Sequence, residues 1–265
     1  MFAFNGDKRG QLGVCLGISL LAFLFSVSAP AQQSTSIEGQ LVRDSPERFL
    51  AKHHVSTTQE AVVSALNHDD PEVRKAASHV LSSHWPKEAV APLEAAMLQE
   101  NDERTRIAIA SDLAELGYKA GREMLTTECH NAREWGTTRI LAARMLTQIH
   151  DNSCVDAILE ILQSDSDPQD TLAKIDALDL VTMFTNHSTP QEYRKVLDLV
   201  MNALNDPDLG VRLTASVTLG RLGDASAIPA LQVALASEQE ETVRSAMLVE
   251  LKRLRSLQQG RKVHQ

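Results

Sequence analysis

Histidine, cysteine and acidic side chains are the groups in this 265-residue chain that could bind a metal or carry out acid–base chemistry. His53 and His54 are adjacent, so their rings diverge on a helix, and His79 and His84 are five residues apart, a poor spacing for two ligands. The chain lacks a glycine-rich phosphate loop and the C-x-x-C, H-E-x-x-H and G-x-S-x-G motifs. We therefore predict no metal, no cofactor and no enzymatic activity.

The composition favours helices and argues against a nucleic-acid partner. Hydrophobic residues make up 43% of the chain but aromatic residues only 4%, so the core must be built from Leu, Ala, Val and Ile. The net charge is −9, and an acidic protein gains nothing from counterion release at a phosphate backbone. Few rings are present on which bases could stack.

The first 31 residues have the pattern of a secretory signal peptide. Lys8 and Arg9 precede an apolar run over residues 12–29, and Ala29-Pro30-Ala31 supplies the cleavage pattern. We predict cleavage after Ala31 and a periplasmic or secreted protein. The run is close to the roughly 20 residues needed to span a bilayer, so an uncleaved inner-membrane anchor remains the alternative. No later run approaches that length, which predicts that the mature chain does not span a membrane.

A basic residue recurs at intervals of 32 to 38 residues through the rest of the chain, and we call it the marker of each repeat. The six markers are Arg74, Arg106, Arg139, Lys174, Arg212 and Arg244. Seven residues after each marker the side chain is apolar, in Leu81, Leu113, Leu146, Val181, Leu219 and Leu251. Positions three, seven and ten after the marker share one stripe of an α-helix. The pattern predicts six helices that pack through this stripe.

A second column and a second helix complete each repeat. In five copies an acid stands four residues before the marker, as in Asp70 and Glu240, where it complements the helix dipole. Another amphipathic segment precedes each marker helix, for example residues 89–98 and 228–235. Such pairs bury their apolar faces by stacking. We expect a polar leader over residues 32–57 with a short capping helix from Pro46 to His54, a repeat domain over 58–257 and a basic tail over 258–265.

The most regular stretch reads D-P-D-L-G-V-R at 206–212, L-G-R-L-G-D at 219–224 and A-I-P-A-L at 227–231, and D-D-P-E-V-R-K-A-A stands at 69–77. These motifs resemble the HEAT repeat, in the short form associated with phycobilin lyase subunits. The resemblance implies an all-α fold, a right-handed α-solenoid of about six helix pairs. It also implies that markers and their preceding acids bond between neighbouring repeats, a structural ladder of Asp70, Arg74, Asp102, Arg106, Arg139, Asp208, Arg212, Glu240 and Arg244.

Two cysteines remain after the leader, Cys129 and Cys154. In the repeat alignment Cys154 corresponds to Gly121, eight positions before Cys129. Eight helical residues are about 12 Å along the axis, added to about 9 Å between adjacent helices. This exceeds the roughly 7 Å between Cα atoms that a disulfide can join. We therefore predict no disulfide between them.

A stack of helix pairs exposes a long surface along its second helices, and this favours a scaffold that binds another protein or peptide in the cell envelope. The columns five and nine residues after the marker lie opposite the packing stripe and are expected to face solvent, Ser111 among them. The expected partner-binding residues on the concave face are His79, Ser83, Glu115, Arg144, Gln148, Asp179, Arg221 and Arg253. The alternatives are an accessory or lyase-type enzyme subunit in the envelope and a scaffold tethered by its uncleaved N-terminal segment.

Overall fold

The computed structural model describes residues 45–133, 135–164, 171–184 and 189–263. The predicted signal peptide and residues 32–44 of the leader lie outside this part of the chain. The described helices all belong to one compact unit. Within these ranges no helix combines the length and the hydropathy needed to cross a bilayer.

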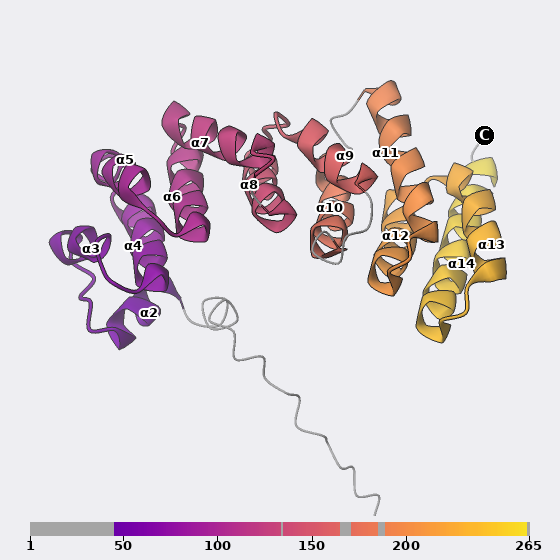
Figure 1. Cartoon of the computed structure of the whole chain (residues 1–265), viewed down its shortest axis with the longest axis horizontal. Coiled ribbons are helices and arrows are strands. Elements are labelled where there is room, and N and C mark those ends of the chain that lie inside the picture. The colour runs from indigo at the N-terminus through magenta and orange to yellow at the C-terminus, as the bar shows by residue number, and fades with distance from the viewer. Residues whose placement is uncertain (1–44, 134, 165–170, 185–188, 264–265) are drawn as a thin grey trace, which may run out of the picture. The chain divides into compact units, whose positions relative to one another are not determined.

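Apart from the loops, the described residues form helices in the order α2 to α14 (Figure 1). Their bounds are α2 Pro46–Lys52, α3 Gln59–Ala65, α4 Pro71–His84, α5 Val90–Gln99, α6 Glu103–Glu115, α7 Lys119–His130, α8 Gly136–Gln148, α9 Val155–Gln163, α10 Thr171–Phe184, α11 Pro190–Asn202, α12 Leu209–Leu222, α13 Ile228–Ser237 and α14 Glu241–Val263. Short 3-10 turns, η2 at Ala203–Asn205 and η3 at Ala225–Ala227, follow α11 and precede α13. The segment predicted as a basic tail continues α14 as far as Val263.

The helices form six pairs, α3–α4, α5–α6, α7–α8, α9–α10, α11–α12 and α13–α14, and α2 precedes the first pair. The second helix of each pair packs on the second helix of the next, from α4 on α6 to α12 on α14 (Figure 1). The predicted all-α solenoid of six helix pairs is confirmed. The predicted capping helix is also present, as α2, whose Pro46 follows the N-cap Ser45.

The packing stripe read from the sequence is the core. The six apolar residues seven positions after the markers are 0 to 3% exposed. The residues three positions after the markers are fully buried, in Ala77, Ile109, Ala142, Ala177, Ala215 and Met247. Full burial of one such leucine contributes about 1.5 to 3 kcal/mol. The core therefore runs from pair to pair along the second helices and also joins the two helices of each pair.

The acids that precede the markers have a different role from the one that the resemblance implied. Asp70, Asp102 and Asp208 are the N-cap residues of α4, α6 and α12, and their carboxylates accept hydrogen bonds from backbone N–H groups of their own helices. Among the described residues these three acids accept no hydrogen bond from a marker of a neighbouring pair, although the charge of Asp102 acts on Arg74 of the previous pair. A carboxylate at an N-cap is already occupied by the first-turn N–H groups that have no partner inside the helix.

The markers themselves do bond between repeats. Nε of Arg74 donates to Glu100 Oε2 at 2.6 Å, and Nη2 donates to Oε1 of the same carboxylate at 2.7 Å. Glu100 is the C-cap residue of α5, the first helix of the next pair. The third nitrogen, Nη1, donates to the backbone carbonyls of His68 and Asp69 in its own pair. One guanidinium thus joins the loop of its own pair to the acid of the next.

Arg212 repeats this geometry near the other end of the chain. Its Nε and Nη2 donate to Glu238, the C-cap residue of α13, at 2.7 and 3.1 Å, and its Nη1 donates to the carbonyls of Asp206 and Pro207. The hydrogen bonds from Arg212 lower the pKa of Glu238 to about 2. A buried ion pair of this kind is sensitive to the loss of either partner.

The remaining inner markers find carboxylates in the following pair as well. Arg106 pairs with Glu128 of α7 at 2.8 Å, and Arg139 pairs with Glu160 of α9 at 2.7 Å. Lys174 lies 3.2 Å from Asp206, and both side chains are buried. We call these five inter-pair contacts the marker ladder. Its acids come from the first helix of each following pair or from the loop after it, and not from the N-cap.

The prediction that Cys129 and Cys154 cannot pair is wrong, because they form a disulfide with their Cα atoms 6.2 Å apart. The prediction assumed that α7 and α9 keep the register of the other first helices. Instead the end of α7 lies against the start of α9: Thr126 Oγ1 is 3.3 Å from Ser153 Oγ, and His130 Nε2 is 3.0 Å from Asp156 Oδ1. The contacts between these helices therefore join residues 25 to 27 apart, less than one repeat.

Replacing Cys129 and Cys154 by Ala should lower the free energy of unfolding by about 3 kcal/mol, because the bond closes a loop of 25 residues. Chemical denaturation with and without reductant measures this. Reductant should destabilise the wild-type protein and leave the double variant unchanged. A wild-type protein that behaves identically with and without reductant, on a gel after thiol blocking and in denaturation, would contradict the disulfide.

The replacement Glu238→Gln should lower the thermal midpoint at pH 7 by about 5 to 10 °C, which corresponds to about 2 to 3 kcal/mol for a chain of this size. Because the folded pKa of Glu238 lies below its ordinary value, its contribution is present above about pH 4.5 and is lost as the pH falls toward 2. The midpoint of the variant should therefore depend less on pH in that window.

The matched control is Glu123→Gln, which removes an exposed carboxylate that pairs with Lys119 four residues away on α7. Exposed pairs of this type contribute little to stability, because water and salt screen both charges. Equal losses in the two variants would show that the marker ladder does not stabilise the stack.

Candidate functional site

The second helices α4, α6, α8, α10, α12 and α14 present their non-core side as one surface, which we call the second-helix face. Each of the eight expected partner-binding residues lies on one of these helices. Arg144 is half-buried, and the other seven are exposed. Ser111, which was expected to face solvent with them, is buried, so the column five residues after the marker is not uniformly exposed.

A groove of about 790 Å³ runs across α4, α6 and α8 on this face. It brings together three of the expected residues, His79, Glu115 and Arg144. The other residues that line it are Pro46, Lys75, Ala76, Ala108, Ser111, Asp112 and Met145. Ser83, Gln148, Asp179, Arg221 and Arg253 do not line this groove. Its lining includes acidic and basic groups together with alanine and methionine side chains.

Asp112 is the buried acid of the groove. Its carboxylate accepts a hydrogen bond from the hydroxyl of Ser78, and its Oδ1 lies 3.2 Å from His79 Nδ1. Both partners are on α4, one helix pair earlier in the chain. The bond to Asp112 raises the pKa of His79, since it favours the charged imidazolium.

Glu115 lies one helical turn after Asp112 on α6. Burial raises the pKa of Glu115, and the charge of Asp112 raises it further, while His79 acts in the opposite direction. The groove therefore holds two carboxylates one turn apart on α6, with the imidazole of His79 beside Asp112. Such a group can accept hydrogen bonds from amide, hydroxyl or cationic groups of a ligand.

Ion pairs between successive second helices continue along the face. Arg144 Nη2 of α8 is 3.7 Å from Asp176 Oδ1 of α10, and Asp179 Oδ1 of α10 accepts from Arg221 Nη1 of α12 at 2.7 Å. On α14, Arg253 Nη1 lies 3.8 Å from Glu250 Oε2. Four of the eight expected residues, namely His79, Arg144, Asp179 and Arg221, thus contact a neighbouring second helix in addition to facing outward.

Sequence reasoning missed Asp112 and Asp176. Both are acids on the second helices, and each contacts a residue of the previous pair. The signal was available for Asp112: it stands 33 residues after His79 and 34 after Ser78, about one repeat, so the stack brings it beside them. An acid one repeat after a histidine or a serine on a stacking helix predicts such a contact.

Among the described residues, one cluster has the ligand types of a metal site: Cys129, His130 and Cys154, whose ligand atoms all lie within 4.8 Å of one another. The two sulfur atoms are joined in the disulfide, and metals bind the thiolate form of cysteine. In this state the cluster offers the imidazole of His130 alone, and that ring already contacts Asp156 and the carbonyl of Thr126.

The family model for HEAT repeats matches residues 48–114 and 185–252, two stretches that together make up about half of the chain. Between them lie α7 to α10, the part in which the sequence motifs are weakest. No protein among those with curated descriptions matches the chain.

Two solved structures are similar to this chain. One is an engineered protein, 18% identical, with a TM-score of 0.43 over 75% of this chain and 97% of that protein. The other is the complex of CpcE and CpcF of phycocyanin lyase from Nostoc sp. PCC7120. It is 20% identical, with a TM-score of 0.33 over 74% of this chain and 94% of that chain.

The replacement Asp112→Asn should lower the pKa of His79 toward its ordinary value, because it removes the charge that favours the imidazolium. NMR titration of the His79 ring protons measures this. A histidine with a raised pKa stabilises the folded state below its unfolded pKa of about 6.5, and this contribution is lost as the pH rises through the folded value.

The replacement Asp176→Asn, in which the removed acid lies on α10, three second helices away from His79 on α4, is the matched control and should leave that titration in place. A His79 titration that is the same in wild type and Asp112→Asn would contradict the contact.

Proposed function

Because the chain belongs to the HEAT repeat family, we propose that it is a non-enzymatic scaffold that binds another protein or peptide on the second-helix face. The groove across α4, α6 and α8 is the observation that supports this most directly. Stacked helix pairs offer extended surfaces of this kind, and the partner contacts several repeats at once.

The groove favours a peptide segment that carries a cationic or hydrogen-bond-donating side chain next to small apolar ones. Asp112 and Glu115 supply carboxylates on α6, and Ala108 of the same helix and Met145 of α8 supply apolar contacts. Lys75 and Arg144 at the sides of the groove can bind the acidic groups or carbonyls of the same segment. A volume of about 790 Å³ accommodates a few side chains and not a whole domain.

We further propose that the scaffold acts in the cell envelope, as a periplasmic or secreted protein. The signal-peptide pattern of residues 1–31 supports this, and so does the disulfide between Cys129 and Cys154, since structural disulfides persist in oxidising compartments.

The test is comparative capture from an envelope extract with the full chain, expressed with its N-terminal segment, as bait. One variant, Glu115→Lys, changes the groove, and a second, Arg221→Glu with Arg253→Glu, changes the C-terminal part of the second-helix face. We expect at least one of these variants to capture about tenfold less of a protein that the wild type captures, with little change in thermal midpoint. The N-terminal residue of the purified bait should be Gln32.

The matched control is Glu123→Lys, the same charge change at an exposed site on the first helix α7. It should capture the same proteins as the wild type. A capture profile that none of the variants alters would contradict the assignment of the second-helix face. A reproducible bound chromophore or metal would favour an enzyme subunit, and an intact N-terminal segment in the purified protein would favour the membrane tether.

A further inference from the structure

Among the described residues, Arg244 is the marker that makes no contact of the marker-ladder type. Its Nη1 donates to the carbonyls of Glu238 and Leu235, so it binds the loop of its own pair as Arg74 and Arg212 do. The Nε side of the Arg244 guanidinium has a different partner from that of Arg74 and Arg212. The carboxylate that pairs with it among the described residues is Glu241 of the same helix, at 3.9 Å and itself largely exposed. The side chain of Arg244 is 40% exposed, against 17% for Arg74 and 16% for Arg212.

The surface around Arg244 is the one that a following helix pair would cover. Four residues after each marker, the side chain packs toward the next pair. In the first five copies that residue is fully buried, in Ser78, Ala110, Ala143, Leu178 and Ser216. In the last copy it is Leu248, which is 54% exposed. A large apolar side chain thus stands where the inner pairs make a close contact.

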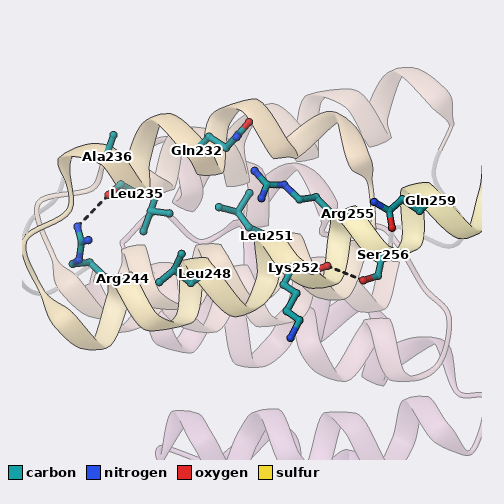
Figure 2. Close-up of a pocket in the computed structure, with 10 residues that line it drawn as sticks. All are labelled: Gln232, Leu235, Ala236, Arg244, Leu248, Leu251, Lys252, Arg255, Ser256 and Gln259. Atoms are coloured by element: carbon teal, nitrogen blue, oxygen red, sulfur yellow. Dashed lines mark hydrogen bonds between the residues drawn. The ribbon is translucent and has the colours of Figure 1, made fainter.

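A groove of about 720 Å³ lies at this end, between α13 and α14. Figure 2 shows Arg244, Leu248, Lys252 and Arg255 along α14, with Leu235 of α13 beside Leu248 and Arg244 bonded to the Leu235 carbonyl. None of the ten lining residues is acidic, although the whole chain carries a net charge of −9. The groove therefore combines an apolar strip of Leu235, Ala236, Leu248 and Leu251 with three cations and three uncharged polar side chains.

We propose that this C-terminal groove binds an amphipathic helix of a different protein, and that a carboxylate at the end of that helix pairs with Arg244. The contacts of the earlier markers indicate what kind of helix would bind here. Glu100 and Glu238, which bind the Nε edges of earlier markers, are the C-cap residues of α5 and α13, two short apolar helices. The occupant supplies to Arg244 the kind of acid that Glu100 and Glu238 supply to Arg74 and Arg212.

A second copy of the chain does not fit this position. The acids Glu100, Asp206 and Glu238 stand six residues before their own markers, and in the first pair that position is His68. Its Nδ1 accepts a hydrogen bond from the backbone of Asp70, and it brings no carboxylate. In addition, α2 packs on α4 at the N-terminal end of the stack. A head-to-tail contact would therefore set Arg244 against a histidine.

The test uses the full chain and a fluorescent peptide with the sequence of residues 86–102, which contains α5 and Glu100. Fluorescence anisotropy should show saturable binding with a dissociation constant below about 1 mM. A peptide with Glu100→Gln should bind at least about fivefold more weakly, because it loses the charge-assisted pair. The protein variant Arg244→Gln should bind the original peptide with the same loss and should no longer distinguish the two peptides.

The apolar strip is tested by Leu248→Asp, which should weaken binding at least about tenfold. Its matched control is Val249→Asp, since Val249 is 63% exposed on the same helix but does not line the groove. This control should stay within about twofold of the wild type.

Circular dichroism of each variant should match that of the wild type, which checks that the variants fold. Absence of saturable binding, or equal losses in Leu248→Asp and Val249→Asp, would overturn the proposal and leave this end as a solvated cap. Self-association of the chain that Arg244→Gln abolishes would overturn the choice of a different protein as occupant.

Discussion

A basic side chain that reaches from one helix pair to a carboxylate of the next is the contact on which this stack depends. In Arg74 and Arg212, Nη1 donates to backbone carbonyls in the loop of its own pair, and Nε and Nη2 donate to the carboxylate of the following pair. The planar group has donors in a fixed fork, so both bonds set the distance and the angle between pairs. Apolar burial drives the stacking, whereas this contact fixes its register.

The register in turn determines which side chains meet on the second-helix face. Residues about one repeat apart become neighbours, as His79 and Asp112 do at 3.2 Å. The groove across α4, α6 and α8 exists because three helices from three pairs hold their side chains at this spacing. No single pair could form it. The same spacing explains why α14 exposes Arg244 and Leu248, since both occupy positions that the next pair covers in the inner pairs.

The features that could be predicted from the sequence are local or periodic. The stripe through Leu81 and Leu219 follows from helical spacing alone, and the capping box of Thr189 and Glu192 is a property of one helix end. The features that could not be predicted depend on how pairs are placed against each other. The acids Glu100 and Glu238 stand six residues before the marker of their own pair, but Arg133 occupies this position before Arg139. The markers Arg106 and Arg139 therefore pair with acids at other positions, Glu128 and Glu160.

The disulfide was not predicted because it too depends on how two pairs are placed against each other. A uniform repeat places Cys154 far from Cys129, and the shift of α9 along α7 removes that separation. The residues of the groove were predicted only in part: the two columns of exposed positions included His79, Glu115 and Arg144, but the buried Asp112 has no signal in its own helix. Its partners, Ser78 and His79, are one pair away, so its role follows from the repeat spacing and not from the pattern of its own helix.

The most direct test of this account is a double-mutant cycle between Arg74 and Glu100, measured by chemical denaturation of the wild type, Arg74→Gln, Glu100→Gln and the double variant. The account predicts a coupling free energy of about 1 to 3 kcal/mol between residues that belong to successive pairs. Additive effects, with a coupling below about 0.5 kcal/mol, would show that stacking is set by apolar contacts alone and would contradict the central role of the marker ladder.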